Sequence, residues 1–244
     1  MRKIAKIALA AVFAAPGLML AQNTQTQSVE MNASLSGANE NPAVETNVAA
    51  DVSIMMDFMG SFDDDSFDGI VNFYSGNDNS DADAPEALGD VEMVTVHMQA
   101  DISGLSGETF TGGHIHRGAR GVNGPVVINL DVMEMTPTMA TATVSTTVEL
   151  TAEMDIATAF DVVANPEHYY VNLHTTDNPG GVVRAQLQLS SDSRTESLER
   201  KITRLEDRLM MMQSTLDNID KNVANIGRRV GLNTSSTQVV GSAN

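Results

Sequence analysis

The chain has 244 residues, no cysteine and a formal net charge of −18 at pH 7. Without cysteines it forms no disulfide, so its fold must rest on a hydrophobic core, on bound ions or on self-association. The excess of negative charge repels phosphate backbones and anionic headgroups, which argues against nucleic acid and membrane surfaces as partners.

The N-terminal segment has the pattern of an export signal. Three cationic residues precede an apolar run over residues 7–20, as in a signal peptide. We therefore expect residues 1–21 to be a signal peptide, cleaved after Ala21 or nearer Ala14, and the protein to be periplasmic or extracellular. An uncleaved anchor is the alternative, although Pro16 interrupts the run. After signal removal we expect no membrane insertion.

Charge divides the remaining chain into two parts. Residues 22–190 hold 25 acidic residues, three arginines and no lysine, a net charge of −22, whereas residues 191–244 hold eight cations and seven acids. The first part favours cations as ligands.

Residues 22–30 are polar and rich in Gln and Thr, which predicts a flexible leader. Over residues 31–190, short runs of Val, Thr, Ile and Tyr, several with alternating polarity, are separated by Gly, Pro, Asn and Asp. This pattern predicts an all-β sandwich. One short helix is expected within "TAEMDIATAFDVV", with the leading Thr151 as its cap.

The C-terminal segment changes to a heptad pattern, which predicts a coiled-coil helix over residues 195–231. A disordered tail over residues 232–244 is expected to follow. The mixed apolar residues do not select one oligomer, so we expect a homo-oligomer between dimer and tetramer. The alternative is a single amphipathic helix packed on its own domain, but such helices usually have a wider apolar stripe. The seam consists of Leu198, Ile202, Leu205, Leu209, Met212, Leu216, Ile219, Val223, Ile226 and Val230.

Histidines suggest a metal site. Residues two apart on a strand share a face, so His114 and His116 of "HIH" can reach one ion, and His174 ends the run "YYVNLH". Imidazole is a ligand for copper, zinc, iron and nickel. In the alternative interpretation these imidazoles bond to loop backbone and fix the turn.

Three motifs resemble, in order and spacing, the signatures of the CHRD domain, the module named after chordin. They are "LSGANENPAV", "HIHRGARGVNGPVVINL" and "YYVNLHTTDNPGGVVRAQL". The resemblance covers roughly residues 31–189 and implies an immunoglobulin-like β-sandwich or barrel. The sequence departs from the family pattern at two places: the family usually has Pro-Pro at residues 41–43 and Gly-Glu at residues 181–182. The acidic stretches 57–68 and 77–90 resemble enlarged loops.

A fainter likeness is to copper/zinc superoxide dismutases, through "VTVHMQADISGLSGETFTGGHIHRG" and the third motif above. It implies copper ligands at His114, His116 and His174, and an anion-guiding role for Arg184. The bridging histidine, the zinc ligands and the cysteine pair of those enzymes are absent from the sequence, so only a mononuclear copper site is expected.

The only arginines of the acidic part are Arg117, Arg120 and Arg184, and all lie in the histidine-bearing motifs. They predict a locally positive spot that attracts small anions. Alternatively, Arg184 pairs with a buried carboxylate and stabilises the sandwich, and the forked guanidinium favours this role.

Calcium is a further, weaker candidate, because "FDDDSFDG" and "NDNSDAD" concentrate oxygen ligands without matching an EF-hand. Solvated acidic loops are the commoner explanation.

The sequence thus predicts an exported binding or structural module, made multivalent by a coiled coil, with an extracellular protein or polymer as ligand. The resemblance implies extracellular protein binding for chordin itself. A mononuclear copper redox protein is the alternative, and the sequence shows no other catalytic motif.

Overall fold

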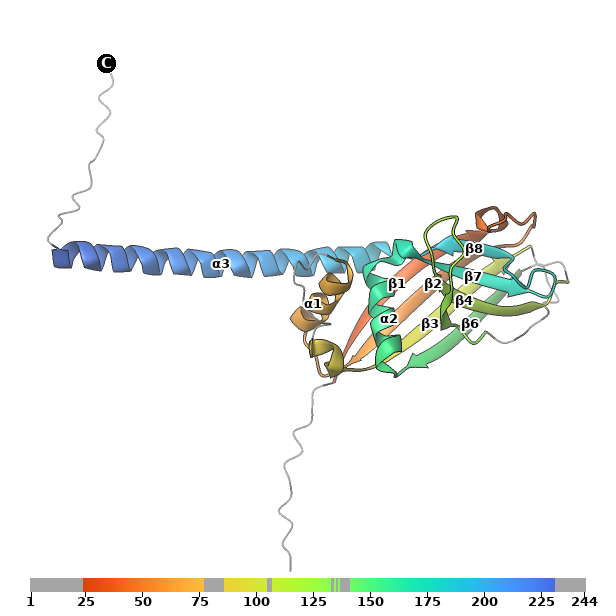
Figure 1. The fold of residues 1–244 in the computed structure, drawn as a ribbon, viewed down its shortest axis with the longest axis horizontal. Coiled ribbons are helices and arrows are strands. Elements are labelled where there is room, and N and C mark those ends of the chain that lie inside the picture. Colours follow the sequence, from red (N-terminus) through yellow and green to blue (C-terminus); the bar gives the residue numbers. More distant parts are fainter. Residues whose placement is uncertain are drawn as a thin grey trace, which may run out of the picture.

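One antiparallel sheet forms the body of the protein (Figure 1). The structure is a computed structural model that describes residues 24–76, 86–104, 107–132, 134, 136 and 141–230. The strand order is β5-β4-β7-β8-β1-β2-β3-β6, and β9 pairs with β1. The strands are β1 (Gln25–Ser36), β2 (Ala49–Gly60), β3 (Val91–Ser103), β4 (Phe110–Arg117), β5 (Val126–Asn129), β6 (Thr141–Leu150), β7 (Tyr169–Thr175), β8 (Val183–Gln186) and β9 (Gln188–Leu189).

The sheet curls into a near-barrel, so its two halves enclose one core. Alternation along the strands supplies that core: in β2, the residues Ile54, Met56 and Phe58 are fully buried while their neighbours face outward. The structure confirms the prediction of an all-β sandwich or barrel followed by a helix.

Two helices cover the end of the barrel nearest the C-terminal helix (Figure 1). Helix α1 spans Asp64–Tyr74 and helix α2 spans Glu153–Ala164. Phe58, Phe67 and Phe160 pack together where these helices meet the sheet, with ring centroids 4.4–5.4 Å apart. Helix α2 was predicted from its spacing, but its N-cap is Ala152 and no side chain caps it, so the proposed capping role of Thr151 was wrong.

The predicted flexible leader over residues 22–30 was wrong from Gln25 onward. Strand β1 begins there and pairs with β2 along its whole length, from Gln25 opposite Gly60. Alternate side chains of β1 enter the core from Val29 onward. Before Val29 both faces of the strand carry polar residues, so the sequence of this segment shows no apolar alternation.

The acidic stretch 57–68 is not an enlarged loop. Strand β2 continues through Gly60, and α1 begins at Asp64. The Asp63 carboxylate accepts a hydrogen bond from the Ser66 backbone N–H at 2.8 Å, which caps the helix. Residues 77–85 of the second acidic stretch lie outside the described residues, and residues 86–90 form a 3-10 helix.

Helix α3 (Ser191–Val230) has 40 residues, which corresponds to a length of about 60 Å. It lies beside α1 at its start and then projects beyond the barrel (Figure 1). Among the described residues, no helix combines the length and apolar character needed to cross a membrane. The predicted signal peptide and the tail over residues 232–244 lie outside the described residues.

Candidate metal centre

The three candidate histidines come from two neighbouring strands on the outer face of the sheet. In the register of β4 with β7, His114 lies opposite Asn172, His116 opposite Tyr170 and His174 opposite Gly112. Their inward neighbours, such as Ile115 and Leu173, are core residues. Alternation therefore places all three imidazoles on one face, as "HIH" and "YYVNLH" predicted.

Backbone carbonyls fix the orientation and tautomer of two rings. His116 Nδ1 lies 3.0 Å from the Gly124 carbonyl, and His174 Nδ1 lies 3.1 Å from the Pro179 carbonyl. A carbonyl only accepts, so each Nδ1 carries the proton and each Nε2 keeps a lone pair. This is the usual arrangement behind a metal-bound imidazole.

The nitrogen atoms converge. His114 Nδ1 donates to His174 Nε2 at 2.9 Å, and one ligand atom from each of the three rings lies within 4.8 Å of the others. His116 Nε2 is buried and has no hydrogen-bond partner among the described residues. The cluster therefore gathers imidazole nitrogens, which suit transition metals, at one point. His116 and His174 keep the Nε2 lone pairs that metal binding requires, whereas His114 would bind an ion through Nδ1 only after the proton there moves to Nε2.

Burial lowers the pKa of all three histidines below the ordinary value of 6.5. Desolvation is the largest cause for each ring, and neighbouring positive charge lowers the pKa further: His116 acts on His114, Arg184 on His116, and His114 on His174. The imidazoles are consequently neutral at pH 7, the state in which they bind metals.

Comparison with known families places this face within a recognised module. The model of the CHRD domain matches residues 31–187, which is more than half of the chain. The chain belongs to the CHRD family. No curated protein and no solved structure matched it in the corresponding searches.

The matched region ends before α3, so the C-terminal helix is an addition to the CHRD domain. The structure supports only one feature of the fainter likeness to superoxide dismutases, namely the group of three histidines. The two other histidines of the described residues lie elsewhere: His97 is on β3, beside Asp57 and Thr147, and His168 is exposed before β7.

Arg184 of the CHRD domain is enclosed by protein groups. Its side chain is 3% exposed, and Nε lies 3.8 Å from the Glu40 carboxylate, which is also buried. The guanidinium donates to the Asn39 carbonyl at 2.6 Å and to Asn123 Oδ1 at 2.7 Å. Two roles were predicted for Arg184, and these contacts support the one in which it stabilises the sandwich. They leave little of the guanidinium charge free to attract anions.

Of the other two arginines, Arg117 lies apart from Arg184, and only Arg120 lies near it. Arg117 is exposed and lies 3.6 Å from the Asp161 carboxylate of α2. Arg120 is exposed and lies near Arg184 on the rim of a small surface pocket. Two of the three positive charges are therefore paired with carboxylates.

Two residues that were not among the predicted site residues, Tyr170 and Glu40, complete the surroundings of the histidines. The Tyr170 ring stacks on His116 at 4.9 Å, and the Arg184 guanidinium lies 4.7 Å from the centroid of the Tyr170 ring. The buried Glu40 carboxyl group lies 3.8 Å from Arg184 Nε. The period of two in β7 places Tyr170 on the histidine face, whereas Glu40 is 144 residues distant in sequence and has no comparable signal.

The calcium candidates gain no support from the described residues. In the first acidic stretch, Asp63 caps α1, and Asp65 and Asp68 face arginines of α3. These carboxylates therefore serve the fold. The stretch "NDNSDAD" lies outside the described residues.

Proposed function

We propose that this protein is an exported, non-enzymatic binding module whose CHRD domain holds one transition-metal ion at His114, His116 and His174. The observation that carries the proposal is that His116 Nε2 is buried without a hydrogen-bond partner among the described residues, in a cluster whose three rings each have a ligand atom within 4.8 Å of the others. Burying an unpaired polar atom costs about 1–3 kcal/mol, and an ion at this point removes that cost.

Copper is the ion we propose. The donor set has three neutral imidazoles, and hard cations such as calcium prefer oxygen ligands. Among divalent first-row ions, copper binds nitrogen donors most tightly, with zinc as the main competitor.

The ion would tie together two loops on the outer face of the sheet. The carbonyl groups of Gly124 and Pro179, which orient two of the ligands, belong to the loops over residues 118–125 and 176–182. A metal ion would hold these loops in one arrangement, as structural sites do. We propose that the loops form the surface that binds an extracellular protein or polymer.

Arg184 favours binding over dismutase-type redox chemistry, the alternative function. An arginine that steers anions needs a free, accessible charge. Arg184 is buried and lies beside Glu40.

Self-association through α3 makes the module multivalent in this proposal. The seam side chains from Leu198 to Ile226 are at least half exposed, from 50% for Ile219 to 64% for Leu209. A long helix with such a seam gains most of its stability by packing against another helix. Repetition of a weak site then raises avidity without new contacts.

Metal content tests the proposal. The purified full chain, without a metal-binding tag, is loaded with copper, desalted and analysed by mass spectrometry for metals. We expect one copper per chain in the wild type and a loss of at least tenfold in affinity for His116→Ala. His168→Ala, which alters an exposed histidine outside the centre, is the control and retains the metal. Equal retention by both variants would show adventitious binding and overturn the proposal.

A further inference from the structure

Helix α3 presents different faces to its own CHRD domain and to solvent. On the domain side, Arg200 Nε lies 3.2 Å from Asp68 Oδ1 of α1, and Arg204 Nη2 donates to Asp68 Oδ2. With Ile202 as heptad position a, Arg200 and Arg204 occupy positions f and c, on the side of the helix opposite the seam.

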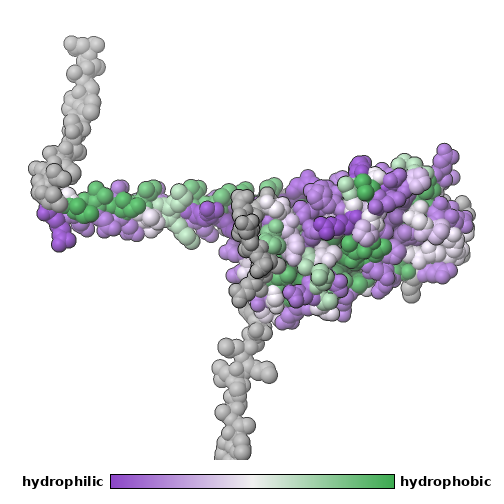
Figure 2. Space-filling view, viewed as in Figure 1, coloured by the Kyte–Doolittle hydropathy of each residue, from purple (hydrophilic) through white to green (hydrophobic). Residues whose placement is uncertain are grey.

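The seam is therefore free even where α3 is attached to the domain. Leu198 and Ile202 flank Arg200 in sequence, yet each is 55% exposed with the domain in place. Along the part of α3 that projects beyond the barrel, apolar side chains lie on one edge of the helix and polar side chains on the other (Figure 2). The apolar seam consequently runs from the attached end to the free end without being used by the domain.

Charges beside the seam differ in sign on its two sides. Positions e carry acidic side chains at Glu199, Glu206 and Asp220, and no basic side chain. Positions g carry basic side chains at Arg194, Lys201, Arg208 and Arg229, and no acidic side chain. Charges at these two positions select the partner and orientation of coiled coils.

We infer that the seam binds α3 of a second copy of this chain, parallel and in register. In a parallel pair, position g of one helix faces position e of the following heptad in the other. Arg194 then faces the partner's Glu199, and Lys201 faces the partner's Glu206. Each of these pairs occurs twice, because the partner's basic residues face the same acidic residues of the first helix. An antiparallel pair sets g against g and e against e, which brings like charges together. This inference rests on the self-association proposed above and adds its direction and register.

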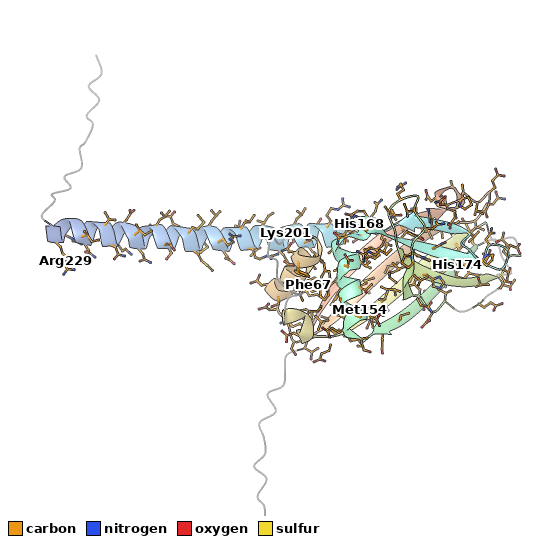
Figure 3. All side chains as sticks on the ribbon, viewed as in Figure 1. Phe67, Met154, His168, His174, Lys201 and Arg229 are labelled. Carbon is orange, nitrogen blue, oxygen red and sulfur yellow. The ribbon has the colours of Figure 1, made fainter. Side chains whose placement is uncertain are left out.

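The inferred arrangement determines where the domains lie. Because Asp68 is attached to the c and f side of α3, each CHRD domain lies outside the helical stalk, next to its first turns. Parallel chains gather all domains at one end of that stalk. His174 lies in the part of the domain remote from the free end of α3, whereas Lys201 lies near the junction (Figure 3). All metal centres are then presented together at the end opposite the C-terminus.

The absence of native cysteines makes disulfide trapping a clean test of direction. Two variants of the full chain, Leu205→Cys and Val223→Cys, are each equilibrated in a glutathione redox buffer, alone and as an equal mixture. In a parallel, in-register pair each introduced thiol faces its own copy. We expect each variant alone to be mostly disulfide-linked, and the mixture to contain almost no linkage between the two variants.

Asn225→Cys is the control, because position 225 lies off the seam, and we expect at least fivefold less linkage from it. Linkage only between the two different variants would show an antiparallel pair, which overturns this inference but leaves self-association intact. No linkage, together with a monomer mass in sedimentation equilibrium, would overturn both. Equal linkage of Asn225→Cys would show random collision and would also overturn the inference.

Discussion

Gly124 lies where no larger residue fits. A Cβ atom at this position would come 1.6 Å from the Arg117 carbonyl oxygen, so a side chain forces the loop away from β4. The Gly124 carbonyl also orients His116. We predict that Gly124→Ala destabilises the CHRD domain by about 3 kcal/mol, as severe overpacking does, and weakens copper binding.

Chemical denaturation and copper titration measure these two effects. Gly180→Ala is a matched control in the second loop of the centre, since a Cβ atom there meets nothing within 4 Å. Similar stability for both variants would contradict the steric account.

Glu40 gives the stability a characteristic pH dependence. Burial raises the pKa of Glu40 from 4.5 to about 7, and the nearby Arg184 only partly opposes this shift. A folded-state pKa above the unfolded value means that the folded state binds the proton more tightly. The contribution of Glu40 to the free energy of unfolding is therefore fully present below pH 4.5 and is lost as the pH rises through 7.

The test compares the free energy of unfolding of the wild type and Glu40→Gln between pH 4.5 and 7.5. The three histidines act in the opposite direction, because their lowered pKa values remove stability as the pH falls below 6.5. That histidine effect is common to both proteins and cancels in the difference. We predict that the advantage of the wild type over the variant shrinks as the pH rises, and a constant or growing advantage would contradict it.

At the scale of elements, α3 is attached to α1 chiefly through Asp68. Its side chain is 8% exposed and contacts both Arg200 and Arg204, whereas Asp65 is 79% exposed and lies 3.9 Å from Arg204. We predict a coupling energy of about 1–2 kcal/mol between Asp68 and Arg204 in a double-mutant cycle. The same cycle with Asp65 should give less than about 0.5 kcal/mol. Both coupling energies are measured by denaturant unfolding. Equal values for the Asp68–Arg204 and Asp65–Arg204 pairs would show that burial of Asp68 does not strengthen its ion pair.

The elements that the sequence predicted are those with an uninterrupted period. The spacing of Ile156, Phe160 and Val163 indicated α2, and more than four heptads indicated α3. Helix α1 was missed because "DDDS" has the composition of a solvated loop, although Asp63 acts as a cap and Phe67 anchors the helix in the core. The prediction of a loop gave more weight to the acidic composition of this stretch than to the spacing of its apolar residues.

Local spacing also explains how much of the candidate centre could be predicted. His114 and His116 are two apart on one strand, so the period of two predicted their shared face, whereas His174 was joined to them only through the likeness to superoxide dismutases. The pairing of β4 with β7, which brings His174 to the other two, is a feature of the complete fold. The ion pair of Arg184 with a buried carboxylate was an alternative at that stage, but its partner Glu40 was not identified. Contacts made by loops across the sheet depend on the complete fold and leave no periodic signal.

For the whole molecule, the exposed seam predicts an oligomer that single substitutions dissociate. We expect Leu216→Asp to increase the dissociation constant at least a hundredfold, because a buried charge in the seam lacks a partner. Met211→Asp is the matched control on the same helix: it lies off the seam and is 69% exposed, so its effect should be within threefold. Sedimentation equilibrium measures both. Equal masses for the two variants would contradict the heptad assignment.

The three scales together support the proposal of a multivalent metal-binding protein. The centre sits on the outer face of the CHRD domain, and α3 provides a separate surface on the other side of the junction. The proposed metal binding and the proposed self-association therefore depend on different residues, and we expect substitutions to alter them independently.

Native mass spectrometry of the copper-loaded, desalted full chain tests the central claim most directly, because one spectrum gives the number of chains and of metal ions. We predict an assembly of two to four chains that carries one copper per chain. An assembly of the same size that retains no copper would contradict the metal centre at His114, His116 and His174.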